Sequence, residues 1–133
     1  MYAIPGFIGF YLFTNNNIPT EFIYISFAYT TAMHLFSAVP DINSDKKANL
    51  KTTAVTLGER VSLLICLILW FSISIILIRL NILIFFVSLI YSILVFLVLF
   101  KFRKVDRVYW VFPYINTIVG FLSFWTIIFI RFI

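Results

Sequence analysis

The chain has 133 residues and a formal net charge of +5, and 63% of its residues are hydrophobic while only 11% are charged. A soluble domain of this size cannot bury so much apolar surface, which excludes an ordinary water-soluble protein and indicates that lipid is its solvent. The basic residues lie in short stretches between apolar segments, a pattern typical of membrane topology and not of nucleic-acid binding.

Apolar runs follow one another along the whole chain. The first, about residues 3–13, is short and contains Pro5, Gly6 and Gly9, so we expect only part of a spanning helix there. A polar turn at residues 14–20 follows it. Four longer runs come next, at about residues 22–40, 61–78, 82–100 and 108–130. Each approaches the length of about 20 residues that a spanning helix needs, and backbone in lipid must be hydrogen-bonded internally, which favours helices.

These runs predict an all-α membrane protein that forms a single transmembrane domain over residues 1–133. Its elements are four complete transmembrane helices and a truncated N-terminal one. Eight basic residues lie in the connectors at residues 41–60 and 101–107, whereas Arg79 and Arg131 lie on the other side. By the positive-inside rule, this multi-pass protein of the cell membrane has its 41–60 loop in the cytoplasm and its C-terminus outside.

The connector after the first spanning run concentrates the charges of the chain. Asp41 and Asp45 are four residues apart, so they share a face if helical structure continues there. Two carboxylates so placed repel each other unless a cation lies between them, and Mg²⁺ suits them because it takes oxygen ligands and keeps positions for phosphate oxygens. Lys46, Lys47 and Lys51 offer positive charge to a diphosphate. We therefore predict that the two aspartates are catalytic metal ligands and that the three lysines bind diphosphate.

The alternative is a solvated loop with incidental charges. We favour a site because three of the five acidic residues of the chain lie between Asp41 and Glu59, among the lysines. The preceding helix supports this interpretation, because its polar residues are spaced by four, three and four positions and form one stripe: Thr30, His34, Ser37 and Asp41. Polar groups at membrane depth usually face a bundle interior or a cavity, so the stripe predicts a pocket that ends at the aspartate pair.

Three residues are candidates for lining this pocket: His34, Ser37 and Asn116. For Ser37, as for Thr30, we favour the competing interpretation of hydrogen bonds between helices. For His34, contact with the leaving diphosphate or the acceptor and a satisfied interhelical histidine are equally consistent with the sequence. Asn116 shares a face of the last helix with Gly120, a pattern typical of close helix packing.

The charged loop resembles the second aspartate-rich motif of the UbiA superfamily of intramembrane prenyltransferases, through the pattern Asp41-x3-Asp45-x5-Lys51-Thr52-Thr53-Ala54-Val55-x-Leu57-Gly58. The resemblance covers essentially the whole chain, as the C-terminal half of a nine-helix bundle in which two such loops bind Mg²⁺ and an isoprenyl diphosphate. It implies that Asp41 and Asp45 are the metal carboxylates and that Lys51, with Lys46 and Lys47, contacts the diphosphate. One departure is Asn49, where many members have glycine, but asparagine tolerates left-handed backbone geometry.

Residues 33–42, together with Thr52-Thr53-Ala54, are most similar to the lycopene elongase branch, whose members attach C5 units to a carotenoid. The implied reaction is the transfer of an isoprenyl group from a diphosphate donor to a lipophilic acceptor, such as lycopene. A quinone-precursor ring, a glycerol lipid or haem fits the same motif. The alternative from another class is a non-catalytic membrane subunit or a transporter fragment that uses the charged loop for docking.

The first aspartate-rich motif of the superfamily is absent, since no acidic residue precedes Glu21. We therefore expect the chain to be a fragment that begins within the fifth helix of such a bundle. By itself it would be inactive, and its partner would be a segment that carries the first motif, joined to it or present as a separate N-terminal chain.

Overall fold

A computed structural model describes residues 4–79, 81–101 and 103–132, and this part of the chain contains helices and no strand. The helices are α1 (Ile4–Thr14), α2 (Thr20–Ala38), α3 (Ile42–Lys47), α4 (Thr53–Leu57), α5 (Glu59–Leu77), α6 (Ile82–Leu99) and α7 (Val105–Phe132). The all-α fold predicted from the apolar runs is thus confirmed for the described residues. Residue 3, where the sequence analysis began its first helix, lies outside them.

The four predicted spans correspond to α2, α5, α6 and α7, with ends that differ by up to three residues. Three of these helices are long and apolar enough to cross a membrane: α5, α6, and α7 over Val105–Thr126. The 19-residue α2 is not among them, since polar residues such as Thr30, His34 and Ser37 interrupt its apolar sequence. The described residues therefore support three spans by length and composition, and the predicted count of four is not confirmed.

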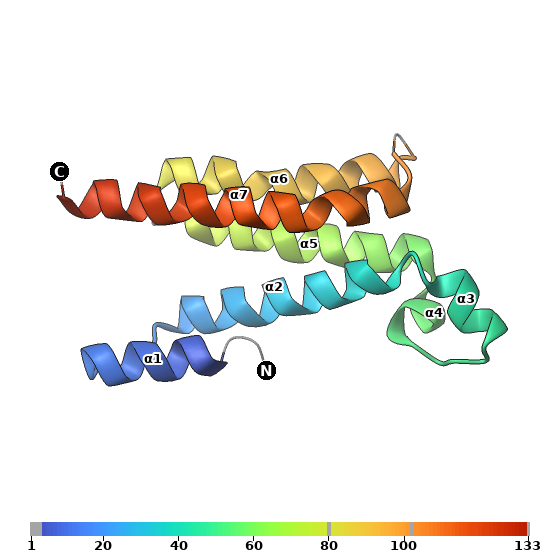
Figure 1. Cartoon of the computed structure of the whole chain (residues 1–133), viewed down its shortest axis with the longest axis horizontal. Helices are drawn as coiled ribbons and strands as arrows, with labels where there is room; N and C mark the ends of the chain where they lie inside the picture. The colour runs from blue at the N-terminus through green and yellow to red at the C-terminus, as the bar shows by residue number, and fades with distance from the viewer. Residues whose placement is uncertain (1–3, 80, 102, 133) are drawn as a thin grey trace.

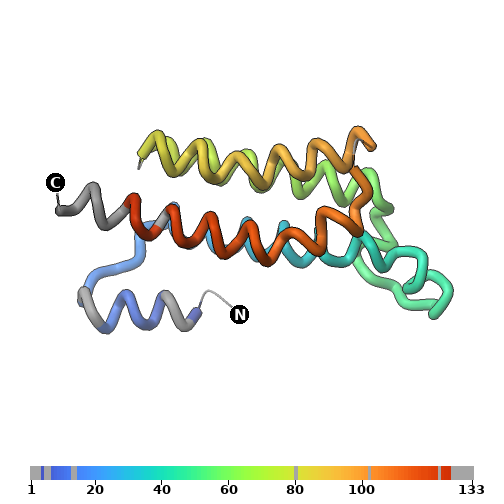
Figure 2. Tube along the Cα trace, turned by 45° about the horizontal axis from the view of Figure 1, so that its top comes forward, coloured from blue at the N-terminus to red at the C-terminus, as the bar shows by residue number. Residues whose placement is uncertain are grey.

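The long helices lie alongside one another (Figure 1). Helices α5 and α6 form an antiparallel hairpin, α2 packs on α5, and α7 packs on α6. Figure 2 shows the same bundle from another side, with α1 apart from the other helices. The two short helices, α3 and α4, lie beyond the ends of α2 and α5, so the segment that carries the aspartates stands at one end of the bundle (Figure 1).

Local chemistry explains where the helices end. Helix α2 stops at Ala38 because Pro40 has no N–H to donate and its ring would clash with the carbonyl group of Phe36. Helix α6 begins after Asn81, whose Oδ1 accepts a hydrogen bond from the N–H group of Leu83 at 2.7 Å. The backbone of Lys101 takes a positive φ of 60° in the turn between α6 and α7.

An aromatic cluster joins the four long helices, one ring from each: Phe36 of α2, Trp70 of α5, Tyr91 of α6 and Phe112 of α7. The ring centroids of Phe36 and Phe112 are 4.9 Å apart, and those of Trp70 and Phe112 are 5.3 Å apart. Tyr91 stacks on Trp70 at 5.6 Å. All four rings are buried. Offset and edge contacts of this kind each contribute about 0.5–1.5 kcal/mol beyond the area they bury.

The two basic connectors lie at the same end of the bundle, and the C-terminus lies at the other (Figure 1). The orientation predicted by the positive-inside rule can be tested with single cysteines in a Cys66→Ala background. Both Asn17, between α1 and α2, and Asn43, in α3, are exposed. We expect a membrane-impermeant maleimide to label Asn17→Cys in intact cells and Asn43→Cys only after the cells are opened. The reverse pattern would show that the orientation is inverted.

Candidate active site

The aspartate pair lies on a short helix beyond the end of α2. Asp41 directly precedes α3 and Asp45 lies in its first turn, where the N–H group of Asp45 donates to the carbonyl oxygen of Asp41 at 2.8 Å. This helical spacing places both carboxylates on one side of a single turn. From the sequence we expected the two carboxylates to share a face if helical structure continued beyond the first spanning helix. The structure has it on the separate helix α3, because Pro40 ends α2 first.

The chain folds back on Asp45 after α3. Asn49 adopts a positive φ of 57°, which asparagine tolerates, and the N–H group of Leu50 donates to the carbonyl oxygen of Asp45 at 2.9 Å. The Thr52 hydroxyl donates to Asp45 Oδ2 at 3.1 Å and accepts from the N–H group of Val55 at 3.3 Å, which caps α4. Thr52 thus joins the carboxylate of Asp45 to the start of α4.

The three predicted diphosphate-binding lysines are exposed in this same segment. Lys46 and Lys47 form the last turn of α3, and Lys51 lies just before α4. Asp41 is exposed as well, whereas Asp45 is half-buried. Within the described residues, no group of three or more His, Cys, Asp or Glu side chains is placed to hold a metal ion. The segment therefore brings together two carboxylates and three ammonium groups, and their roles as ligands remain predictions.

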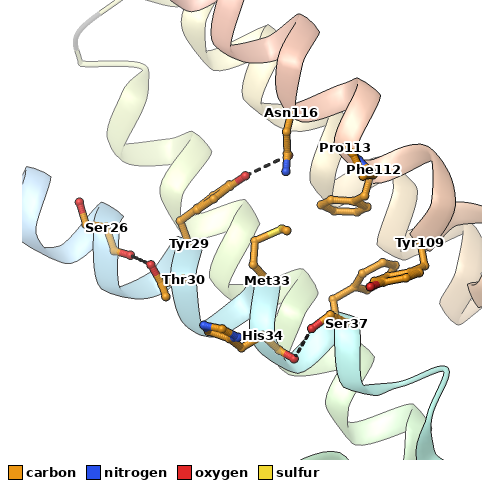
Figure 3. A pocket seen from close by; sticks show the side chains of 11 residues that line it. Ser26, Tyr29, Thr30, Met33, His34, Ser37, Tyr109, Phe112, Pro113 and Asn116 are labelled. Atoms are coloured by element: carbon orange, nitrogen blue, oxygen red, sulfur yellow. Dashed lines mark hydrogen bonds between the residues drawn. The ribbon is translucent and has the colours of Figure 1, made fainter. Parts of the chain in front are cut away.

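A cavity of about 570 Å³, the near chamber, lies between α2 and α7 (Figure 3). Its wall includes Tyr29, His34 and Ser37 of α2 together with Tyr109, Phe112 and Asn116 of α7. The three candidate pocket residues therefore lie around one cavity, at the end of α2 that leads to Asp41. What they bind remains a prediction.

The hydroxyl groups of the polar stripe donate within their own helix. Thr30 Oγ1 donates to the carbonyl oxygen of Ser26 at 2.7 Å, and Ser37 Oγ donates to that of His34 at 2.9 Å (Figure 3). Thr30 and Ser37 therefore do not donate the hydrogen bonds to other helices that we favoured for them. In a helix, the carbonyl group three or four residues back is the acceptor that a serine or threonine hydroxyl reaches most easily.

Two hydrogen bonds between helices converge on Asn116. Its Oδ1 accepts from the hydroxyl of Tyr29 at 3.0 Å and from that of Tyr91 at 2.8 Å, which links α2, α6 and α7. We call this arrangement the Tyr29–Asn116–Tyr91 bridge. From the sequence we placed Asn116 on a packing face and identified neither tyrosine as its hydrogen-bond partner. A side-chain amide within an apolar run indicates that the amide needs hydrogen-bond partners inside the protein, but the sequence does not show which residues they are.

Comparisons with known proteins identify the family. Residues 1–125 match the UbiA prenyltransferase family. The chain belongs to this family. It is similar to "Lycopene elongase/hydratase" of Haloferax volcanii, with 32% identity over 122 residues, and to the protein of the same name in Haloarcula japonica, with 32% identity over 120 residues. These matches cover 92% and 90% of this chain but only 40% and 41% of the relatives.

A third "Lycopene elongase/hydratase", from Halobacterium salinarum, is 29% identical over 120 residues, which are 90% of this chain and 44% of the relative. The chain thus spans less than half the length of each of these curated relatives. No solved structure matches it significantly.

Membership of the UbiA prenyltransferase family and the three apolar helices together make this a multi-pass membrane protein. Large apolar side chains on the outer faces of the helices agree with this, since 66% of Ile68, 62% of Phe86 and 61% of Phe121 is exposed. Lipid tails cover such surfaces without the penalty that water would impose.

The double role of Thr52 leads to a stability prediction. Thr52→Val removes both the cap of α4 and the hydrogen bond to Asp45 Oδ2, and loss of a cap alone costs about 1 kcal/mol. We expect amide hydrogen exchange in α4 to accelerate by about fivefold or more, as measured by mass spectrometry. Thr53→Val is the matched control, since Thr53 is exposed and forms neither bond. Equal acceleration in both variants would contradict the role assigned to Thr52.

Proposed function

We propose that this chain forms part of a membrane enzyme that transfers an isoprenyl group from a diphosphate donor to a lipophilic acceptor. Membership of the UbiA prenyltransferase family supports the reaction class. The names of the relatives, "Lycopene elongase/hydratase", support a carotenoid acceptor such as lycopene. The observation that carries the proposal is the pairing of Asp41 and Asp45 on one turn, just beyond the end of the near chamber at Ser37.

In this proposal Asp41 and Asp45 hold Mg²⁺. The donor set fits the ion, since carboxylate oxygens are the ligands that Mg²⁺ prefers and a site with few protein ligands leaves room for water and phosphate oxygens. Thr52 occupies one oxygen of Asp45 and leaves the other for a ligand. A bound Mg²⁺ supplies positive charge beside the departing diphosphate.

The lysines serve the same leaving group. Lys46, Lys47 and Lys51 are exposed on the segment that carries the aspartates, so their ammonium groups can turn toward a diphosphate held there. Negative charge grows on the diphosphate as the carbon–oxygen bond breaks and its electron pair moves to oxygen. Ammonium groups placed in advance stabilise that charge most in the transition state, which accelerates departure.

The near chamber receives the reacting carbon chains. Met33, Tyr109 and Phe112 give it apolar and aromatic walls, which exclude the water that would otherwise trap an allylic cation. Aromatic faces also attract cations, by about 0.5–2 kcal/mol. A double bond of the acceptor attacks the isoprenyl carbon, a new carbon–carbon bond forms, and the acceptor then loses a proton.

The aspartates can be tested one at a time, in a protein in which this chain is joined to the remaining length that its relatives have. Asp41→Asn and Asp45→Asn keep the size of each side chain but remove its charge. We expect each to lower Mg²⁺-dependent prenyl transfer by about 100-fold or more, measured by product formation from a radiolabelled isoprenyl diphosphate. Asp106→Asn is the control, because Asp106 is an exposed acid at the start of α7, in the other charged connector.

Retained transfer in both aspartate variants would contradict the proposed metal site. If metal-independent association with another membrane protein were lost instead, the segment would be a docking surface. We also propose that the chain needs a segment with further metal-binding carboxylates, so prenyl transfer by the 133-residue chain alone would overturn that part.

A further inference from the structure

Two cavities follow one another along α2 and α7, and they share a wall. Beyond the near chamber, a second cavity of about 260 Å³ lies farther from the charged end. We call it the far chamber. Tyr29 and Asn116 line both cavities, and Tyr91 lines the far one. The Tyr29–Asn116–Tyr91 bridge therefore stands between them, and Figure 3 shows Tyr29 of α2 reaching across to Asn116 of α7 on the side of the near chamber that adjoins the far one.

The bridge is held from several sides. Both tyrosine hydroxyls donate to the same oxygen, Asn116 Oδ1, and the two tyrosine rings meet edge to face with centroids 5.7 Å apart. Tyr91 is 6% exposed and stacks on the buried Trp70. In a bilayer no water replaces a hydrogen bond that opens, so the three side chains favour the closed arrangement.

The two chambers differ in chemistry. The near chamber carries the polar groups of His34 and Ser37 on the side that leads to Asp41. Five aliphatic side chains line the far chamber: Ile25, Ile73, Leu77, Ile84 and Val119. Its Ser88 hydroxyl already bonds to Ser74 Oγ and to the carbonyl oxygen of Phe85, both at 2.8 Å. Trp70, Gly120 and the three residues of the bridge complete its wall. The far chamber therefore suits an apolar chain.

We propose that the Tyr29–Asn116–Tyr91 bridge is the floor of the near chamber and limits the length of the linear isoprenoid chain that it accepts. The inference rests on the proposed function, which places an isoprenoid in the near chamber. With the polar end of the ligand at Asp41, its apolar end points along α2 toward Asn116. The far chamber becomes available to that end only when the floor is removed.

The chain offers matched variants for this test. Asn116→Ala removes the bulk and the hydrogen bonds of the floor, whereas Asn116→Leu removes the hydrogen bonds but keeps the bulk. Gly120 lines the far chamber, and a Cβ added there meets no atom within 4 Å, so Gly120→Leu can add bulk at the wall of that chamber. Gly9→Leu is the control, since a Cβ there also meets nothing within 4 Å and Gly9 lies on α1.

The measurement is the binding of tritiated all-trans farnesol, geranylgeraniol and geranylfarnesol, by scintillation proximity, to the protein in which this chain is joined to the remaining length that its relatives have, purified in detergent micelles. For the wild type we expect affinity to rise with the length of the isoprenol up to a cut-off, which is the length at which the isoprenol reaches the floor. Asn116→Ala should bind the next longer isoprenol about threefold or more tightly, because filling a void restores packing contacts. Asn116→Leu should keep the cut-off of the wild type. Gly120→Leu should have no effect alone but should restore that cut-off in the Asn116→Ala background, and Gly9→Leu should change nothing.

Four results would overturn the inference. An equal loss of affinity for every length in both Asn116 variants would show that the bridge only holds the helices together. A shorter cut-off with Gly120→Leu alone would show that the chambers are already continuous. Failure of every variant to bind any isoprenol would overturn the placement of an isoprenoid in the near chamber, on which the inference rests, whereas binding with an unmoved cut-off would overturn the floor alone.

Discussion

One shared acceptor, the Oδ1 atom of Asn116, joins three of the four long helices of the bundle. In lipid, apolar surfaces gain little by leaving their surroundings, so helices associate through close packing and through hydrogen bonds that need a partner inside the protein. Two tyrosine hydroxyls from α2 and α6 meet this oxygen of α7, next to an aromatic cluster that adds Trp70 of α5. These contacts lie midway along the helices. On one side of them, the near chamber lies between α2 and α7. The same amide therefore joins three helices and lies between the two chambers.

The other end of the near chamber depends on a break in the backbone. Pro40 stops α2, and the chain turns into α3 before the polar stripe of α2 has ended. A continuous helix would carry Asp41 and Asp45 straight on from α2. The turn instead gives them a short helix of their own, and Thr52 ties Asp45 to α4. Charged groups thus gather at one end of the bundle, His34 and Ser37 line the start of the near chamber, and aliphatic side chains line the far chamber beyond it. In the proposed function this gradient matches an isoprenyl diphosphate, which is charged at one end and apolar along its length.

Much of this protein follows from local sequence. The length of the apolar runs predicts helices because a backbone in lipid must satisfy its own hydrogen bonds, and α5, α6 and α7 agree with that prediction. The less apolar α2 shows where the rule weakens, since a helix that faces a polar cavity carries residues that lower its hydropathy. The motif around Asp41 and Asp45 is contiguous, so the family could be recognised without a fold, and the match over residues 1–125 confirms it.

The sequence by itself determined the helices, the spacing of the aspartate pair and the family, because each depends on residues close together in the chain. The tertiary structure alone decided which polar groups meet. Tyr29 and Tyr91 lie 87 and 25 residues from Asn116, and helical periodicity shows which residues share a face but not which faces come into contact. For the same reason the sequence did not show that the hydroxyl groups of Thr30 and Ser37 donate within α2. Nor did it show that the helix face that carries them lines a cavity. The division between the two chambers likewise exists only once α2, α6 and α7 have packed together.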